Sequence, residues 1–220
     1  MSNYHFVVIS GNIAVGKTTL AQRLAGALAW KPYMEDFTGN PYLADFYQNM
    51  AAWSFHSQIF FLARRLQHHH AISLYPGHVL QDRSVYEDAE IFAQNLYQRG
   101  LISPRDYDCY RALYDGVQNF LPPPSLVIYL QAPVHLLLSR IEARGRDYEQ
   151  TITQTYLEDL NALYEAWVER WQASPLLRLS VTDYNILHNE ADLQRIIQRV
   201  QAILVAQDEI PSPKQDHQPN

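Results

Sequence analysis

The sequence predicts an α/β protein with a five-stranded parallel sheet that is flanked by helices on both faces. Three observations indicate this fold. Short runs rich in Val, Ile and Leu alternate with longer helical patterns along the chain, as in strands joined by helical crossovers. The 220 residues are about one domain's worth of chain, enough to bury a sizeable core. Apolar residues make up 47% and charged residues 18%, which excludes a disordered chain and a membrane protein.

The expected elements follow in order. The apolar run YHFVVIS predicts a first strand at 4–10, and the Leu- and Ala-rich segment after it predicts a helix at 17–29. A weak second strand ends near Glu35, and Pro41 opens a long helix that reaches about residue 71. The remaining elements are a strand at 77–82, helices at 85–98 and 104–119, a strand at 126–130, helices at 133–143 and 151–172, a strand at 176–181 and a helix at 191–205.

The domain organisation follows from the same pattern. Residues 1–206 contain no repeat and no internal linker, so they are interpreted as a single domain. The polar segment 207–220 contains three prolines and is interpreted as a disordered tail.

A glycine-rich motif follows the first expected strand directly. The segment GNIAVGKT satisfies the pattern G-x-x-x-x-G-K-[ST] in full and stands before a helix. In this context backbone N–H groups and the helix N-terminus hold a di- or triphosphate, while Lys17 contacts the outer phosphates and the Thr18 hydroxyl contacts Mg²⁺. The motif predicts a P-loop for a nucleoside triphosphate, made by Gly11, Asn12, Ile13, Ala14, Val15, Gly16, Lys17, Thr18 and Thr19.

The ends of the other strands distinguish the classes of P-loop protein. The length argues against a motor, and a Ras-like GTPase would need a D-x-x-G element after the third strand and an N-K-x-D string, which this chain lacks. The third strand is instead followed by Asp82 and Arg83. An acid at this place can meet Mg²⁺ or its water shell, and the arginine can face the transferring phosphate. This pattern favours a small-molecule kinase.

Charge and cysteine content limit the partners. The net charge is −6, and only three of the 17 basic residues are lysines, the rest being arginines. Because no basic run is present, a polynucleotide is not expected as a partner. No signal peptide and no apolar run of roughly 18 residues is found, so we expect no membrane association. The single Cys109 fits a reducing compartment, and we expect a cytoplasmic protein.

The run His68–His70 is a weak candidate for a metal site. Adjacent histidines on a helix point in different directions, and no Glu or Cys stands at a familiar ligand spacing. The run therefore favours no metal centre.

Five longer strings resemble one known family. They are GNIAVGKTTL at 11–20, NPYLADFY at 40–47, WSFHSQIFFLARR at 53–65, DRSVYEDAEIFAQNLY at 82–97 and RIEARGRDYEQ at 140–150. On these strings the chain resembles the deoxyribonucleoside kinase family, and within it the bacterial deoxyadenosine/deoxyguanosine kinases, from about residue 6 to residue 184. The resemblance implies a P-loop kinase with an arginine-bearing lid at about 140–150, ATP as the phosphate donor, a requirement for Mg²⁺ and a homodimer.

The resemblance also implies the catalytic residues. By family position Glu35 takes the proton from the sugar 5′-hydroxyl, although the residues alone would not choose between Glu35 and the adjacent Asp36. Arg83 contacts that glutamate and the 5′-oxygen. Thr18 and Asp82 are expected to bind the metal ion, Asp82 either directly or through a water molecule. The alternatives are a solvated loop acid for Glu35 and a structural ion pair for Arg83.

For the nucleoside, the resemblance implies contacts with both base and sugar. Gln58 reads the base edge with a two-pronged hydrogen bond, as an amide can. Arg65 and Asp88 form a polar pair near the base, found with purine or cytosine acceptance, or else an ordinary surface ion pair. Tyr47 and Glu149 hydrogen-bond the sugar 3′-hydroxyl. The expected apolar walls of the base cleft, which the sequence does not distinguish from core packing, are Trp53 and Phe92.

Two further segments are expected at the donor nucleotide. Arg140 and Arg144 share one helix face and, with Arg146, form a lid whose planar guanidinium groups grip phosphate oxygens. The neighbouring Asp147 and Tyr148 depart from the family pattern. After the fifth strand, the resemblance places the ATP adenine against the segment Thr182, Asp183 and Tyr184.

These expectations combine into one hypothesis. The chain is predicted to transfer the γ-phosphate of ATP to the 5′-hydroxyl of deoxyadenosine or deoxyguanosine. The alternatives are a deoxycytidine or broad-specificity kinase, a nucleoside monophosphate kinase, and a nucleotide-binding regulator without turnover. Gln58 in its apolar surroundings argues against the monophosphate kinase, and Glu35 with Arg83 argues against the regulator.

Overall fold

The computed structural model describes residues 4–35, 39–146, 149, 151–185 and 189–209. Its strands are β1 (Phe6–Gly11), β2 (Lys31–Tyr33), β3 (Val79–Asp82), β4 (Leu126–Gln131) and β5 (Leu176–Ser180). They form one parallel sheet in the order β2-β3-β1-β4-β5. The predicted five-stranded parallel sheet is therefore confirmed.

The register of the sheet brings two motifs to one edge. Ile9 of β1 pairs with Asp82 of β3, and Gly11 pairs with Leu130 of β4. Because all strands are parallel, their carboxyl ends lie at the same edge. The P-loop after β1 and the Asp82–Arg83 turn after β3 therefore meet as neighbours.

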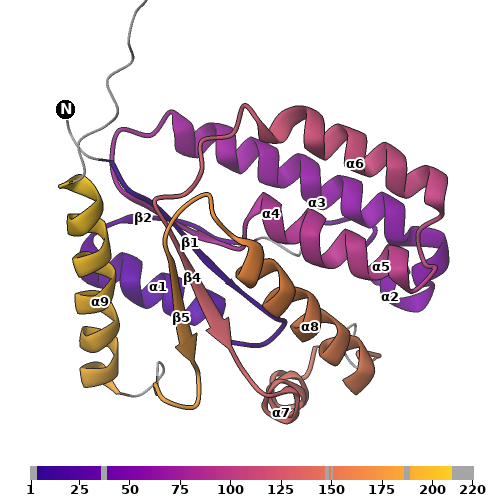
Figure 1. The fold of residues 1–220 in the computed structure, drawn as a ribbon. Helices are drawn as coiled ribbons and strands as arrows, with labels where there is room; N and C mark the ends of the chain where they lie inside the picture. The colour runs from indigo at the N-terminus through magenta and orange to yellow at the C-terminus, as the bar shows by residue number, and fades with distance from the viewer. Residues whose placement is uncertain (1–3, 36–38, 147–148, 150, 186–188, 210–220) are drawn as a thin grey trace, which may run out of the picture.

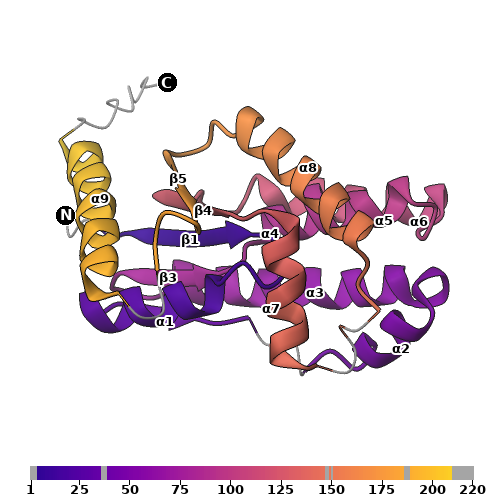
Figure 2. The ribbon, with the colours of Figure 1, turned by 90° about the horizontal axis from the view of Figure 1, so that it is seen from below.

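Helices lie on both faces of this sheet (Figure 1). On one face α1 packs on β1, β2 and β3, and α9 lies beside α1; on the other face lie α8 and the π-helical segment η1. Figure 2 shows α2, α3, α5 and α6 extending beyond the end of the sheet to which the β1 arrow points, where α7 also lies. The helical bounds are α1 (Lys17–Leu28), α2 (Leu43–Gln48), α3 (Met50–Ser73), α4 (Val85–Glu87), η1 (Asp88–Ala93), α5 (Gln94–Gln98), α6 (Pro104–Gln118), α7 (Val134–Arg144), α8 (Gln154–Arg170) and α9 (Glu190–Asp208).

Two of the three hydrophobic clusters among the described residues support the layers around the site. The larger core is built on the continuous apolar strands β1 and β4, whose side chains are almost all fully buried, as both faces of a parallel sheet require. Tyr164 of α8 stacks on Tyr129 of β4, with 5.7 Å between the ring centroids. A smaller core around Leu62, Tyr110 and Tyr114 joins α3 to α6 beyond the sheet. This second core gives α3 a rigid support at the edge where the motifs meet.

Three predicted elements differ from the structure. The predicted helix 41–71 is two helices, because Asn49 leaves the helical conformation and its side chain caps α3 by accepting from the N–H of Ala52 at 3.2 Å. The predicted helix 85–98 contains the π-helical segment η1 in its middle. The last helix continues to Asp208, past the predicted start of the tail, and residues 210–220 lie outside the described residues.

Candidate active site

The P-loop needs glycine at both of its ends. Gly11 has φ 143°, and a Cβ there would lie 2.6 Å from the carbonyl oxygen of Leu130. Gly16 has φ 111° and stands immediately before α1. Residues with side chains rarely adopt these conformations. The two glycines let the loop turn tightly from β1 and aim the N-terminus of α1 at the space above the sheet, where a phosphate would bind.

Asn12 fixes the loop to α8. Its amide group donates to the carbonyl oxygen of Leu157 at 3.0 Å and to Oδ1 of Asn161 at 2.7 Å, and its own Oδ1 accepts from the N–H of Ile13. The side chain is 2% exposed. Asn12 was expected among the ATP-binding residues. In the structure its side chain instead attaches the loop to α8.

Lys17 is held at the mouth of the loop. Its Nζ donates to the carbonyl oxygens of Gly11 at 2.8 Å and Asn12 at 2.9 Å. Burial, together with the nearby Arg83 charge, lowers the pKa of Lys17 to about 8. The ammonium group is thus desolvated and oriented by backbone dipoles before any anion arrives.

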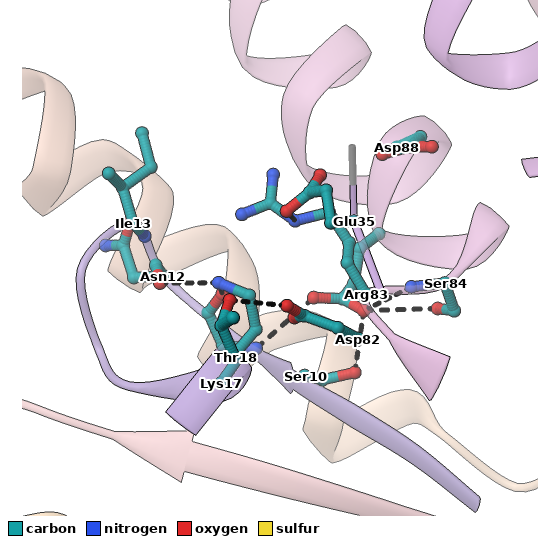
Figure 3. A network of polar contacts seen from close by, with 12 residues as sticks. Ser10, Asn12, Ile13, Lys17, Thr18, Glu35, Asp82, Arg83, Ser84 and Asp88 are labelled. Carbon is teal, nitrogen blue, oxygen red and sulfur yellow. Dashed lines mark hydrogen bonds and ion pairs between the residues drawn. The ribbon is translucent and has the colours of Figure 1, made fainter. Parts of the chain in front are cut away.

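Thr18, in the first turn of α1, contacts Asp82, the last residue of β3 (Figure 3). The Thr18 hydroxyl donates to Oδ2 of Asp82 at 2.5 Å. Oδ1 of Asp82 is buried and accepts no hydrogen bond from any described residue. Burial and the Glu35 charge raise the pKa of Asp82. A hydroxyl and a carboxylate with an unused oxygen are the oxygen ligands that Mg²⁺ takes, so these two residues fit the metal expected from the motif.

Glu35 is paired with two arginines. Its Oε2 lies 3.3 Å from Nε of Arg83, and its Oε1 accepts a hydrogen bond from Nη2 of Arg65. Its side chain is 2% exposed, so the carboxylate is almost completely removed from solvent. The structure therefore brings Glu35 and Arg83 together and excludes a solvated loop acid, whereas Asp36 lies outside the described residues.

Arg83 is fixed in an unusual conformation. Its φ of 65° is uncommon for a residue with a side chain, and its guanidinium carbon lies 4.2 Å from the ring centroid of Phe92. Burial is the largest single effect and opposes its charge, but Glu35, Tyr164, Glu87 and Asp88 together outweigh burial and raise the pKa of Arg83. The arginine is consequently a permanent cation beside the Glu35 carboxylate.

These groups line a cavity of about 700 Å³. Residues 13–19 of the P-loop and α1 form one part of its wall, and Glu35, Arg83 and Gln58 form another. Gln58 on α3 is 4% exposed, and its Oε1 accepts no hydrogen bond from the part of the chain that the structure describes. A buried amide with an unused acceptor is suited to a ligand that offers hydrogen-bonding edges.

Apolar rings surround Gln58 in the cavity wall. Tyr47 and Phe92 line the cavity, as expected, whereas Trp53 packs against Phe46 and Leu96 in a separate cluster. Six further hydrophobic wall residues were not predicted: Leu43, Phe46, Phe61, Leu136, Tyr156 and Val181. Phe61 follows Gln58 by three residues on one helix, and this spacing could have identified it.

Arg65 and Asp88 are a buried pair next to Glu35. Nε of Arg65 lies 3.2 Å from Oδ2 of Asp88, and both side chains are less than 5% exposed. The alternative of a surface ion pair is therefore wrong. Among the described residues the pair does not line the cavity. Burial raises the pKa of Asp88 to about 7.

The lid arginines reach the cavity from α7 and from the residues just after it. Arg140, Arg144 and Arg146 all line it, and Nη1 of Arg140 donates to the carbonyl oxygen of Val15 in the P-loop at 2.7 Å. Arg144 donates to Oε2 of Glu149 at 2.5 Å, and Arg146 lies 3.4 Å from Oε1 of the same carboxylate. Glu149, expected at the sugar, thus pairs with the lid here. The neighbouring 147 and 148 lie outside the described residues.

Only some of the residues expected after β5 line the cavity. Tyr184 lines the cavity, and its hydroxyl accepts from Nη1 of Arg199 at 2.8 Å. Thr182 lines the cavity as well, whereas Asp183 is exposed and is not among the lining residues that the structure describes. Asn185, which was not predicted, also lines the cavity.

Other features have no place in this cavity. Over the described ranges, no group of three or more His, Cys, Asp and Glu side chains is arranged to hold a metal, and His69 of the histidine run contacts the carbonyl oxygen of Pro122. Cys109 is free and exposed. Within the described residues, no helix is both long and apolar enough to span a bilayer.

Comparisons with known proteins agree with this geometry. A family model described as "Deoxynucleoside kinase" matches residues 7–205. The chain is 36% identical over 200 residues to the deoxyadenosine/deoxycytidine kinase of Bacillus subtilis, covering 90% of this chain and 92% of that protein. It is 33% identical over 210 residues to the deoxyguanosine kinase of the same organism, covering 93% and 100%.

A solved structure gives the same result. The deoxyadenosine kinase from M. mycoides, with the products dCMP and a flexible dCDP bound, superposes with a TM-score of 0.80 at 25% identity, covering 89% of this chain and 98% of that one. The same kinase with bound dATP superposes with a TM-score of 0.79. The family match spans nearly the whole domain that carries the cavity. The chain therefore belongs to the deoxynucleoside kinase family, phosphotransferases with a hydroxyl group as acceptor.

Proposed function

We propose that the protein transfers the γ-phosphate of ATP to the 5′-hydroxyl of a purine deoxyribonucleoside, deoxyadenosine or deoxyguanosine. The observation that carries this proposal is the placement of Glu35 and Gln58 in the same cavity as the P-loop. A P-loop, a carboxylate and a buried amide that line one cavity suit the binding of a triphosphate donor, the acceptance of a proton and the recognition of a base. The cavity of about 700 Å³ is within the size range of small-molecule sites.

At the donor side, the loop and the lid act on the phosphates. The backbone N–H groups before α1 bind phosphate oxygens, and Lys17 leaves its two carbonyl partners to contact the outer phosphates. Arg140 and Arg144 of α7, with Arg146 just after it, contact the phosphates and neutralise the charge that develops during transfer. Thr18 and Asp82 would hold Mg²⁺, which would supply positive charge to neutralise the phosphates.

At the acceptor side, Glu35 accepts the proton of the 5′-hydroxyl. Arg83 and Arg65 orient this carboxylate, since both guanidinium groups contact it. Arg83 also faces the oxygen that attacks, where its permanent charge favours the transition state. Tyr47 binds the 3′-hydroxyl, and Glu149 joins it when the lid arginines turn to the phosphates.

The base lies between Gln58 and the aromatic walls. Gln58 offers one acceptor and one donor, which match the amino group and ring nitrogen of adenine in a two-pronged hydrogen bond. The names of the relatives support purines, because they include deoxyadenosine and deoxyguanosine kinases. Deoxycytidine is a second candidate acceptor, because the deoxyadenosine/deoxycytidine kinase of Bacillus subtilis is 36% identical to this chain.

A phosphoryl-transfer assay tests the proposal. Purified protein with ATP and Mg²⁺ is offered the four deoxynucleosides and their ribose counterparts, and each 5′-monophosphate is quantified. We expect the highest kcat/KM with deoxyadenosine or deoxyguanosine. A preference for thymidine, or the absence of any product, would refute the proposal.

We further propose a homodimer in the cytoplasm. Leu113 on α6 is 45% exposed and Phe120 just after α6 is 84% exposed, which leaves apolar side chains for a second copy to cover. Light scattering should give about twice the chain mass of 25.5 kDa. A monomer at micromolar concentration would contradict the dimer without affecting the proposed reaction.

A further inference from the structure

Glu87 is a fully buried carboxylate that no motif assigns to catalysis. It ends α4, is 0% exposed and accepts five hydrogen bonds. Its Oε1 accepts from the N–H of Gly11 at 3.2 Å and the hydroxyl of Tyr164 at 2.9 Å. Its Oε2 accepts from the hydroxyl of Ser10 at 2.8 Å and from the N–H and hydroxyl of Ser84 at 2.8 and 3.2 Å. A buried carboxylate is costly, so this complete set of donors identifies a built site.

The five donors come from three separate segments. Ser10 and Gly11 end β1 and open the P-loop, and Ser84 follows the turn after β3. Tyr164 lies on α8, the helix to which Asn12 of the P-loop is also bound. Figure 3 shows Ser10 and Ser84 beside Asp82 and Arg83 at these strand ends. One side chain thus joins the phosphate-binding loop to the turn of the acceptor side.

The turn that Glu87 holds is strained. Arg83 has φ 65°, a conformation that surrounding contacts must enforce for a residue with a side chain. Its N–H pairs with the carbonyl oxygen of Ile9 at 3.0 Å, and directly after it Ser84 and Glu87 form a reciprocal capping box. The hydrogen bond to Ile9 therefore holds the backbone of Arg83 itself, and the capping box formed with Glu87 holds the residue that follows it.

We propose that Glu87 is a positioning residue for phosphoryl transfer: it sets the distance and orientation between the P-loop and the Asp82–Arg83 turn. The inference rests on the proposed function, because it assumes that donor phosphate and acceptor hydroxyl meet between these two segments. Glu87 does not line the cavity within the described residues and acts through Arg83 and the loop. Alignment of this kind affects the rate of transfer more than the binding of either substrate.

The test is the substitution Glu87→Gln. An amide keeps the shape but has one acceptor oxygen, so its NH₂ group must face at least two of the five donors. We expect kcat to fall about 10- to 100-fold, while KM for ATP and for the nucleoside changes less than about threefold. Glu165→Gln is the matched control, because Glu165 also accepts from a tyrosine hydroxyl, that of Tyr129 at 2.9 Å, and lies outside the cavity lining.

The measurements use the full chain and the deoxynucleoside that the wild type phosphorylates fastest. Rates are divided by the folded fraction from circular dichroism, so that a loss of stability alone leaves kcat unchanged. If Glu87→Gln does not fold, Ser10→Ala and Ser84→Ala each remove one donor and are expected to lower kcat about three- to tenfold.

The outcomes are distinct. If the wild type is active and kcat of these variants stays within about twofold of the wild-type value, the positioning role of Glu87 is refuted and the proposed function is not affected. A wild type without activity on any deoxynucleoside refutes the proposed function, and the positioning role with it.

Discussion

Glu35 carries the proposed proton transfer, and Glu35→Gln is the substitution that examines it. The change keeps the size of the side chain and removes its charge. In the structure this charge faces Arg83 at 3.3 Å and is hydrogen-bonded to Arg65, all three side chains being 7% exposed or less. The variant therefore loses a proton acceptor and also leaves two buried cations less well compensated.

The two effects have different magnitudes and different readouts. General base catalysis is worth about 10²- to 10⁴-fold. Because phosphoryl transfer depends mainly on positioning and charge stabilisation, we expect the low end, a roughly 100-fold loss in kcat, about 2.7 kcal/mol. Removing one member of a buried ion pair costs about 3–5 kcal/mol of stability. Arg65 retains Asp88 at 3.2 Å, so we expect about 3 kcal/mol and a Tm lower by roughly 6–12 °C.

The assay measures kcat and KM for deoxyadenosine at saturating ATP, at a temperature well below the Tm of the variant. Glu169→Gln is the control: Glu169 is 71% exposed and pairs only with Arg178 among the ion pairs of the described chain. We expect unchanged kinetics for the control, and for Glu35→Gln a KM within about threefold of wild type. Turnover of folded Glu35→Gln within about fivefold of wild type would show that this carboxylate is not the base.

Three further predictions concern other parts of the chain. Because burial and Arg83 lower the pKa of Lys17 to about 8, kcat/KM for ATP should fall as the pH rises through 8 and the cation is lost; a profile that stays flat to about pH 9.5 contradicts this. The double variant Arg65→Ala, Asp88→Ala should change the order of preference among the four deoxynucleosides, and an unchanged order would make the pair structural. Leu160→Ala removes a fully buried side chain of α8 and should lower the free energy of unfolding in urea by about 2–5 kcal/mol, whereas a loss below about 1 kcal/mol would mean that the core closes around the gap.

The fold could be predicted because its signals are local. Each buried strand is a short apolar run, and each crossover helix has its own periodicity, so the order of elements alone implies the parallel sheet. What periodicity could not predict is where a helix is interrupted. Asn49 divides α2 from α3, and its side chain caps α3 by accepting from the N–H of Ala52; the segment 88–93 is π-helical, with hydrogen bonds one residue further along the chain than in an α-helix.

The site was predictable where a motif fixes both residue and place. Lys17, Thr18 and Asp82 follow from strand ends that the register makes neighbours. Contacts between segments far apart in sequence were not predictable in the same way. The hydrogen bond between Arg65 and Glu35 joins residues thirty positions apart, and only the folded chain reveals it. Glu87 had a local signal, the S-x-x-E pattern of a capping box, but its link to β1 is visible only in three dimensions.

The charge distribution connects these observations. The chain has a net charge of −6, but the described lining of the cavity contains five cations, Lys17 and four arginines, against two carboxylates, Glu35 and Glu149. Both carboxylates are already paired with arginines, and apolar side chains in place of such buried pairs often leave stability unchanged or raise it. Stability alone therefore does not explain this excess. A triphosphate with one Mg²⁺ carries net negative charge, and a locally cationic chamber in an acidic protein attracts it in preference to the surrounding surface.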